Sequence, residues 1–189
     1  MLKRIDPKEI GQNVFSLIGD QWMLITAGTA EQCNTMTASW GGLGVLWGAP
    51  MATCYIRPQR YTREFVDREE YFTLAFFDEE HRKALALCGS KSGREVDKVR
   101  ECGFTVKTAE CGAPYFEQAQ LVLVCRKRYA QPMDPDRMPE DVKEKWYPGQ
   151  DYHILYLGEI VEAYQRSRAA ADGKGRCPPQ RNQIPWEDV

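Results

Sequence analysis

The stretch Asn34-Thr35-Met36-Thr37-Ala38-Ser39-Trp40-Gly41-Gly42 is rich in hydroxyl groups and ends in two glycines. Hydroxyls and main-chain N–H groups can hold the oxygens of an anion, and glycine lets a ligand approach the backbone closely. A strand edge that happens to carry threonine and serine explains the stretch equally well, since threonine and tryptophan are common in strands.

Two further segments are suited to binding an anion. Arg57-Pro58-Gln59-Arg60-Tyr61-Thr62 offers two guanidinium groups, which donate charge-assisted, fork-shaped hydrogen bonds. Ser90-Lys91-Ser92-Gly93-Arg94, followed by Asp97-Lys98, precedes a predicted helix whose first amides can face an anion. An exposed basic turn and a capped loop are the alternative interpretations. Together the three segments indicate a site for a flat, aromatic, anionic ligand.

Composition limits the classes of protein to consider. A chain of 189 residues predicts one domain, and a net charge of -2 gives no basic excess for binding nucleic acid or a membrane surface. No apolar run approaches the roughly 20 residues of a membrane helix. The first six residues lack the apolar core of a signal peptide, so we expect a cytoplasmic protein.

The seven cysteines do not form a metal or disulfide pattern. Their number is odd and no two are spaced as C-x-x-C, which argues against a disulfide framework or a zinc ribbon. We expect Cys54 and Cys125, inside strand-like runs, to act as small hydrophobes. The spacing of the two histidines, His81 and His153, supports no catalytic triad or carboxylate pair. We therefore assign no catalytic residue and no metal ligand, and expect a cofactor to supply any chemistry.

The pattern of apolar runs and turns predicts a mainly β, antiparallel fold with flanking helices. Predicted strands cover residues 14–18, 22–26, 36–44, 51–56, 71–77, 104–108, 119–129 and 152–164; predicted helices cover 7–11, 62–68, 78–87, 95–102 and 139–145. Residues 1–166 form the predicted domain, with 131–151 as a polar, proline-rich excursion or lid, and 167–189 as an irregular tail. The absence of a G-x-G-x-x-G turn and of a Walker A sequence argues against a Rossmann or P-loop site.

Five segments, in order, resemble the flavin reductase-like family, whose members form an FMN-binding split β-barrel and include flavoredoxins. The resemblance covers about residues 10 to 165. Its segments are Asn34 to Gly41, Tyr55 to Thr62, Phe72 to Phe77, Gly89 to Arg94 with Asp97-Lys98, and Tyr152 to Ile160.

The resemblance implies a homodimer that binds FMN near the subunit interface. The residues that it implies as cofactor contacts are Thr35, Met36, Thr37, Ala38, Ser39 and Trp40 along the isoalloxazine and ribityl chain, Arg57, Arg60, Tyr61 and Thr62 about the phosphate and ribityl, Ser92, Gly93 and Lys98 as further phosphate contacts, and His153 near the flavin.

Three functions stay open at this stage. The first is an NAD(P)H-dependent flavin reductase, which passes electrons to a small-molecule acceptor or a redox partner protein. The second is a flavoredoxin-type electron carrier that never meets nicotinamide. The third is a binding module that kept the barrel and lost the cofactor.

Overall fold

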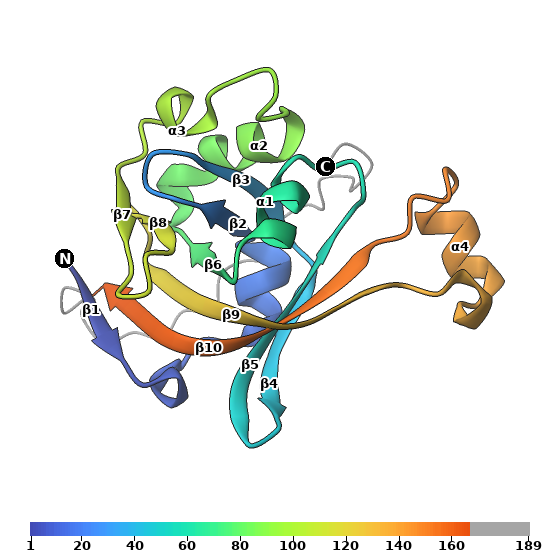
Figure 1. The fold of residues 1–189 in the computed structure, drawn as a ribbon, viewed down its shortest axis with the longest axis horizontal. Helices are drawn as coiled ribbons and strands as arrows, with labels where there is room; N and C mark the ends of the chain where they lie inside the picture. The colour runs from blue at the N-terminus through green and yellow to red at the C-terminus, as the bar shows by residue number, and fades with distance from the viewer. Residues whose placement is uncertain (167–189) are drawn as a thin grey trace.

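The computed structural model describes residues 1–166 as one curved antiparallel sheet with helices packed around it (Figure 1). Hydrogen-bonded neighbours follow the order β3-β2-β6-β9-β10-β5-β4, and β1 pairs with β10. The strands are β1 (Leu2–Ile5), β2 (Met23–Gly28), β3 (Cys33–Ala38), β4 (Gly41–Leu46), β5 (Ala49–Ile56), β6 (Tyr71–Phe76), β9 (Leu121–Pro132) and β10 (Ile154–Arg166), with β7 (Val106–Thr108) and β8 (Pro114–Phe116) in a separate pair. The predicted fold class is confirmed. The tail predicted for 167–189 lies outside the described residues.

Strand β10 joins the two halves of the sheet because it pairs with β9 on one side and β5 on the other. Its register against β9 shifts between Leu157 and Gly158. A Cβ at Gly158 would lie 2.7 Å from both Cys125 Cβ and Phe72 Cζ, so only glycine fits there. The glycine therefore lets three strands approach closely at the centre of the molecule.

Two apolar clusters pack on opposite faces of the sheet. Alternate residues of one strand feed different clusters, as strand geometry requires: Leu123 and Cys125 belong to one, and Val122 and Val124 to the other. Cys54 and Cys125 are fully buried among apolar side chains, which confirms their predicted role as small hydrophobes.

Three helices cover strands β2 and β3, and a fourth lies apart from them (Figure 1). The helices are α1 (Thr62–Arg68), α2 (Arg82–Ser90), α3 (Lys98–Glu101) and α4 (Glu140–Trp146), with 3-10 turns at Pro7–Glu9, Glu79–His81 and Pro135–Arg137. Helix α1 ends at the predicted residue, Arg68, but begins one residue early: Thr62, which is predicted as its N-cap, is its first residue, and Tyr61 holds the N-cap position. No helix within residues 1–166 is both long and apolar enough to cross a membrane.

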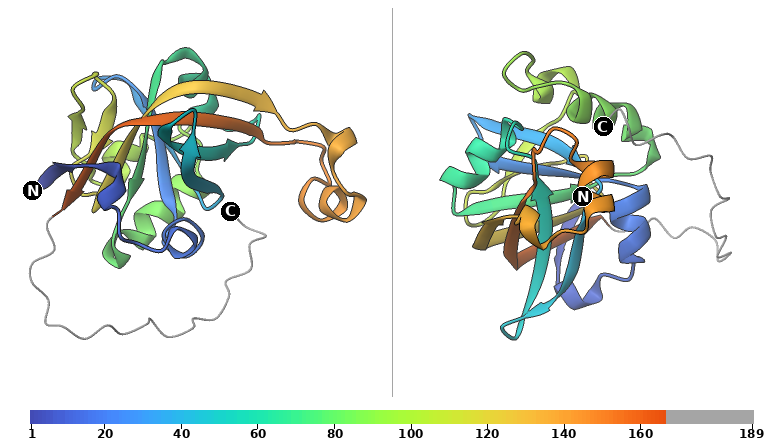
Figure 2. Two further views of the ribbon diagram at one scale, coloured as in Figure 1. Left: turned by 90° about the horizontal axis from the view of Figure 1, so that it is seen from below. Right: turned by 90° about the vertical axis from the view of Figure 1, so that its right-hand side faces the viewer.

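The proline-rich excursion forms an arm that projects from the ends of β9 and β10 (Figures 1 and 2). We call residues 133–153 the arm. It holds α4, close to the helix predicted at 139–145. Strand β9 runs three residues beyond its predicted end, because Pro132 still pairs with Ile154. The arm is therefore displaced by two residues from the predicted excursion and rests on two long paired strands.

Three predicted elements are wrong. Residues 14–18 are not a strand: Asn13 Oδ1 accepts from the N–H groups of Phe15 and Ser16, at 3.0 and 3.3 Å, and starts a turn that continues as a π-helix at Ser16–Asp20. The strand predicted over 36–44 is two strands, broken at Ser39 and Trp40. The helix predicted over 78–87 ends three residues later than predicted, because α2 continues to Ser90.

The β4–β5 hairpin has an exposed apolar tip. Trp47 and Gly48 form its two-residue turn with φ of 52° and 73°, the left-handed conformation that a type I′ turn requires. Val45 is 80% exposed and Trp47 67% exposed. Trp47 therefore lies at an exposed tip, outside both apolar clusters.

Candidate functional site

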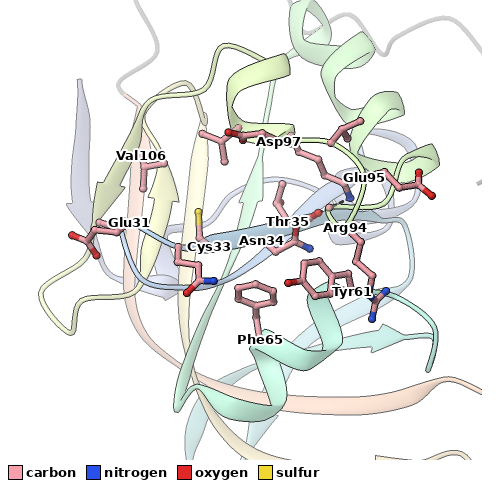
Figure 3. A pocket seen from close by; sticks show the side chains of 16 residues that line it. Glu31, Cys33, Asn34, Thr35, Tyr61, Phe65, Arg94, Glu95, Asp97 and Val106 are labelled. Atoms are coloured by element: carbon pink, nitrogen blue, oxygen red, sulfur yellow. Dashed lines mark hydrogen bonds between the residues drawn. The ribbon is translucent and has the colours of Figure 1, made fainter.

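Two cavities lie on either side of strand β3. The first, which we call the arm cavity, has a volume of about 100 Å³ and is lined by Met36, Thr37, Ala38, Ser39, Trp40, Tyr55, Arg57, Arg60, Trp146 and His153. The second, the loop cavity, has about 460 Å³ (Figure 3). Four of the predicted cofactor contacts line the loop cavity: Thr35, Tyr61, Gly93 and Lys98. The structure thus divides the predicted residues between two places, and Thr62 and Ser92 line neither.

Aromatic rings close the arm cavity. Trp40, in the break between β3 and β4, meets Trp146 of the arm edge to face, with centroids 5.2 Å apart. The Trp40 ring also lies 4.9 Å from the ring of His153. Tyr147 Oη and His153 Nδ1 are hydrogen-bonded at 2.9 Å. The walls of this cavity therefore come from the sheet on one side and from the arm on the other.

Arg57 fastens the arm to the sheet. Its Nη2 donates to the carbonyl oxygen of Trp146 at 2.9 Å, and its Nη1 lies 2.5 Å from Asp151 Oδ2. The guanidinium also lies over the Tyr147 ring, 5.3 Å from the centroid. Burial alone would raise the pKa of Asp151, but hydrogen bonds from Gln59 and Arg57 outweigh it and lower that pKa. Arg57 thus connects the cavity wall to the position of α4.

Two cations hold the C-terminal end of α2. Arg60 Nη1 donates to the carbonyl oxygen of Gly89 at 2.9 Å. Lys98 Nζ donates to the carbonyls of Cys88 and Thr35 at 2.9 and 2.8 Å. Positive charge at this end complements the helix dipole and the carbonyls that the helix leaves unpaired. Burial lowers the pKa of Arg60 and lowers that of Lys98 to about 8.

The threonine hydroxyls of the predicted site face protein partners. Thr35 Oγ1 lies 2.9 Å from Thr26 Oγ1, and Thr37 Oγ1 donates to the carbonyl of Leu85 at 2.5 Å. Thr62 Oγ1 accepts from Asn34 Nδ2 at 2.7 Å. All three predicted residues are buried, so their hydroxyls hold strands and helices together. Ser39 lines the arm cavity together with Thr37.

The loop cavity is larger, but its charges are mixed. Figure 3 shows Glu31, Glu95 and Asp97 around it together with Arg94. Arg94 pairs with Glu64, and its guanidinium lies 4.4 Å from the centroid of the Tyr61 ring. The lining of the loop cavity carries three carboxylates, Glu31, Glu95 and Asp97, against two cations, Arg94 and Lys98, so it gives an anion little net attraction.

The 92–96 turn forms one wall of the loop cavity. Ser92 Oγ accepts from the N–H of Arg94 at 3.2 Å, and the Ser92 carbonyl accepts from Glu95 and Val96. A Cβ on Gly93 would meet Asn34 Oδ1 at 1.9 Å. Ser92 and Gly93 therefore shape this turn and its contact with β3.

His153 is neutral at neutral pH. Burial, and then the nearby charges of Arg57 and Arg60, lower its pKa to about 4, although Asp151 raises it. A neutral imidazole has one ring N–H and one acceptor nitrogen, so the ring can donate one hydrogen bond and accept another. His153, predicted to lie near the flavin, thus lines the wall of the arm cavity.

Sequence reasoning missed Tyr55 and Trp146 as cavity residues. Tyr55 lies two residues before Arg57, and residues two apart on a strand share a face, so the strand period could have identified it. Trp146 follows the helix predicted in the excursion. Only the folded position of the arm brings Trp146 to Trp40, which is distant in sequence.

Comparison with known proteins identifies the family and the fold of the chain. The family model described as "Flavin reductase like domain" matches residues 15–177. No curated protein sequence matches the chain. Similar solved structures include a flavoredoxin from Methanosarcina acetivorans, with 24% identity, 91% of this chain and 82% of that chain covered, and a TM-score of 0.65.

Two other structures have the same fold. A flavoredoxin of Desulfovibrio vulgaris (Miyazaki F) has 16% identity, covers 89% of this chain and 80% of its own, and has a TM-score of 0.63. An FMN-binding domain of a flavin reductases-like enzyme from Shewanella baltica has 18% identity, coverage of 87% and 77%, and a TM-score of 0.62. Structures related at this level establish the fold, which is the predicted split barrel.

Proposed function

This chain belongs to the flavin reductase-like family, and from that premise we propose that it is an oxidoreductase that binds FMN in the arm cavity. One observation carries the proposal. The predicted residues Met36 to Trp40, Arg57, Arg60 and His153, which lie far apart in sequence, line one cavity. This cavity combines two guanidinium groups with flat aromatic walls.

The chemistry of the cavity fits an anionic aromatic cofactor. Arg57 and Arg60 suit a phosphate, because guanidinium donors form charge-assisted, paired hydrogen bonds with phosphate oxygens. Trp40 and His153 offer ring faces and edges for an isoalloxazine. The N–H groups of Ser39 and Trp40 lie between two strands and suit the polar edge of the ring system.

The volume of the cavity indicates that the arm has to move. Cofactor sites usually measure about 300–1,000 Å³, and this cavity has about 100 Å³. Trp146 is the wall residue contributed by α4 of the arm, and it contacts Trp40. Swinging Trp146 away would enlarge the cavity without disturbing the sheet. We propose that FMN replaces the contact between Trp146 and Trp40.

The remaining predicted residues hold the framework in this proposal. Lys98 and Thr35 tie β3 to α2, and Thr62 ties α1 to β3 through Asn34. Tyr61 lies against Arg94, and Ser92 and Gly93 form the 92–96 turn. Their role as direct flavin contacts stays a prediction of the resemblance.

FMN bound here would supply the redox chemistry, accepting hydride from NADH or NADPH and passing electrons to a small molecule or a redox partner protein. The chain's own residues would bind, orient and shield it. Neutral His153 would offer a hydrogen bond without adding charge, and the two arginines would favour a negatively charged ligand. Trp146 would limit the access of water.

The proposal is tested by the visible spectrum of the protein loaded with FMN, recorded anaerobically during addition of NADH and then NADPH. A flavin reductase loses its flavin absorbance promptly with one or both donors. A protein that binds FMN and stays oxidised with both donors is a flavoredoxin-type carrier. A protein that does not take up FMN is a binding module, and the proposal is then wrong.

We also propose that two copies of the chain associate through the tip of the β4–β5 hairpin. Val45, Leu46 and Trp47 expose apolar surface there, and burying it against a second copy would remove that surface from water. The mass of the protein in solution, measured by light scattering, should be that of a dimer. Trp47→Glu should shift it toward the monomer, whereas Tyr129→Glu, at an exposed apolar residue outside the hairpin, should not.

A further inference from the structure

A pair of thiols brackets the turn that lines the loop cavity. Cys88 lies in the last turn of α2, and Cys102 follows α3. Their sulfur atoms are 3.7 Å apart. A disulfide needs the sulfurs at about 2.05 Å, so a small shift of either side chain would join them. Gly103, with φ of 63°, follows Cys102 and gives the backbone freedom at this point.

The two thiols differ in access. Cys88 is fully buried, whereas Cys102 is half-buried and in contact with solvent. The two thiols are hydrogen-bonded to each other, and Cys102 Sγ also lies 3.7 Å from the carbonyl oxygen of Ala84. A reagent can therefore reach Cys102 first, and Cys88 stands directly behind it.

A cation lies beside this pair. The Lys98 ammonium bonds the carbonyl oxygen of Cys88, and its charge acts on both sulfurs. Positive charge favours the thiolate, which is the form of cysteine that attacks a disulfide. Burial works in the opposite direction and raises the pKa of both thiols. The pair is thus suited to slow oxidation through its exposed member.

We propose that Cys88 and Cys102 form a reversible disulfide when the protein meets a low-molecular-weight disulfide such as oxidised glutathione. The Cys102 thiolate attacks one sulfur of the reagent and releases one small thiol, which leaves a mixed disulfide. The Cys88 thiolate then attacks the Cys102 sulfur and releases the second small thiol. The two cysteines lose two electrons and two protons, and the reagent gains them as two thiols.

Oxidation would act on the framework of both cavities. The bond would tie the end of α2 to the end of α3 and close residues 89–101 into a loop. That loop contains the 92–96 turn and Lys98. The Cys88 carbonyl accepts from both Lys98 and Arg60, so any shift of the α2 backbone that accompanies the bond would act on both cations. The redox state of the pair would therefore reach Arg60 in the arm cavity.

The other cysteines provide internal controls. Cys54 and Cys125 are close enough to influence each other but are both completely buried, so a reagent cannot reach either. Cys33 is half-buried, and burial raises its pKa to about 11. Cys111 is exposed and is expected to take up glutathione by itself. Cys177 lies outside the described residues.

The experiment uses the full chain without flavin or nicotinamide, so its outcome does not depend on the proposed function. Cys111 and Cys177 are replaced by serine to remove thiols that would react independently. The folded protein is incubated with oxidised glutathione, denatured, alkylated and mapped by mass spectrometry. We expect the number of alkylated thiols to fall by two and a peptide linking Cys88 to Cys102 to appear. Dithiothreitol should restore both thiols.

Single variants separate pairing from other reactions. Cys102→Ser should leave Cys88 alkylated after the same treatment, and Cys33→Ser should leave the linked peptide unchanged. The proposal is overturned if Cys88 and Cys102 stay alkylated in the parent protein. It is also overturned if Cys102 keeps glutathione without linking to Cys88, or if Cys88 is lost in the Cys102→Ser variant.

Discussion

The arm cavity and the loop cavity share strand β3 but differ in what holds their walls. The loop cavity is the larger of the two. Its buried polar groups bind other parts of the protein: Lys98 donates to two carbonyl oxygens, and Asn34 donates to Thr62 Oγ1. The arm cavity is small, yet two arginines, a neutral histidine and several aromatic rings meet there. On our proposal, the arginines and aromatic rings of the arm cavity, rather than its volume, decide where the cofactor binds, and the loop cavity belongs to the framework.

The largest expected effect is on the framework. Lys98→Met keeps an unbranched buried side chain but removes the charged donor to the Thr35 and Cys88 carbonyls. We expect the free energy of unfolding to fall by about 2–4 kcal/mol, since a hydrogen bond to a charged group is worth about 1.5–3 kcal/mol and the cost of burying the ammonium disappears. Urea unfolding measures this change in the free energy of unfolding. Lys83→Met, at an exposed lysine, should change stability by less than about 0.5 kcal/mol. A similar loss in both variants would contradict this role.

The next-largest expected effect is a pH dependence of the free energy of unfolding, which comes from His153 in the arm cavity. The unfolded chain protonates His153 near pH 6.5, whereas the folded protein resists protonation until about pH 4. Between these values the unfolded state binds more protons, so stability falls as the pH drops through this window, by up to about 3 kcal/mol. His153→Gln should remove this part of the acid sensitivity. Parallel stability curves for the two proteins from pH 7 to pH 4 would show that His153 is not buried in its neutral form.

A smaller loss is expected at the contact between β3 and the 92–96 turn. Gly93→Ala places a Cβ 1.9 Å from Asn34 Oδ1, and Asn34 is already bonded to Thr62. Relieving that overlap should cost about 1–3 kcal/mol of stability. Gly44→Ala is the matched control, because its Cβ would meet no atom within 4 Å. Thermal unfolding of both variants measures the difference, and an unchanged Gly93→Ala protein would argue against a rigid framework here.

The smallest effect concerns entry into the arm cavity. Trp146→Ala removes the edge-to-face contact with Trp40. Such contacts are worth about 0.5–1.5 kcal/mol, so FMN should associate roughly two- to tenfold faster. Stopped-flow quenching of flavin fluorescence measures the rate. Glu144→Ala, at an exposed residue of the same helix, should bind at the rate of the unmodified protein. Slower association in the Trp146 variant would mean that the indole guides the cofactor instead of blocking it.

Local patterns predicted the parts of the fold that depend on local chemistry. The alternation of apolar runs and the cap-like sequence near Thr62 located β5, β6 and α1 within one or two residues. The strand predicted at 14–18 is wrong because the side chain of Asn13 caps a helical turn there. One asparagine among apolar residues gives only a weak signal in the sequence.

The candidate site was predictable in its residue types but not in its geometry. The sequence shows hydroxyls and arginines, but not which partner each one finds in the fold. The hydroxyl of Thr37 bonds the carbonyl of Leu85, and Arg57 bonds that of Trp146, across distances in sequence that no local pattern encodes. The arm as a cavity wall likewise depends on tertiary packing.

The most direct test of the account is a fluorescence titration of FMN against three proteins: the unmodified chain, Arg57→Met and Arg94→Met. Arg57 lines the arm cavity and Arg94 the loop cavity. We predict that Arg57→Met raises the Kd by roughly tenfold to a hundredfold, the loss expected for one charge-assisted contact. Arg94→Met should leave the Kd unchanged. Weaker binding by Arg94→Met together with unchanged binding by Arg57→Met would place the cofactor in the loop cavity and contradict the account.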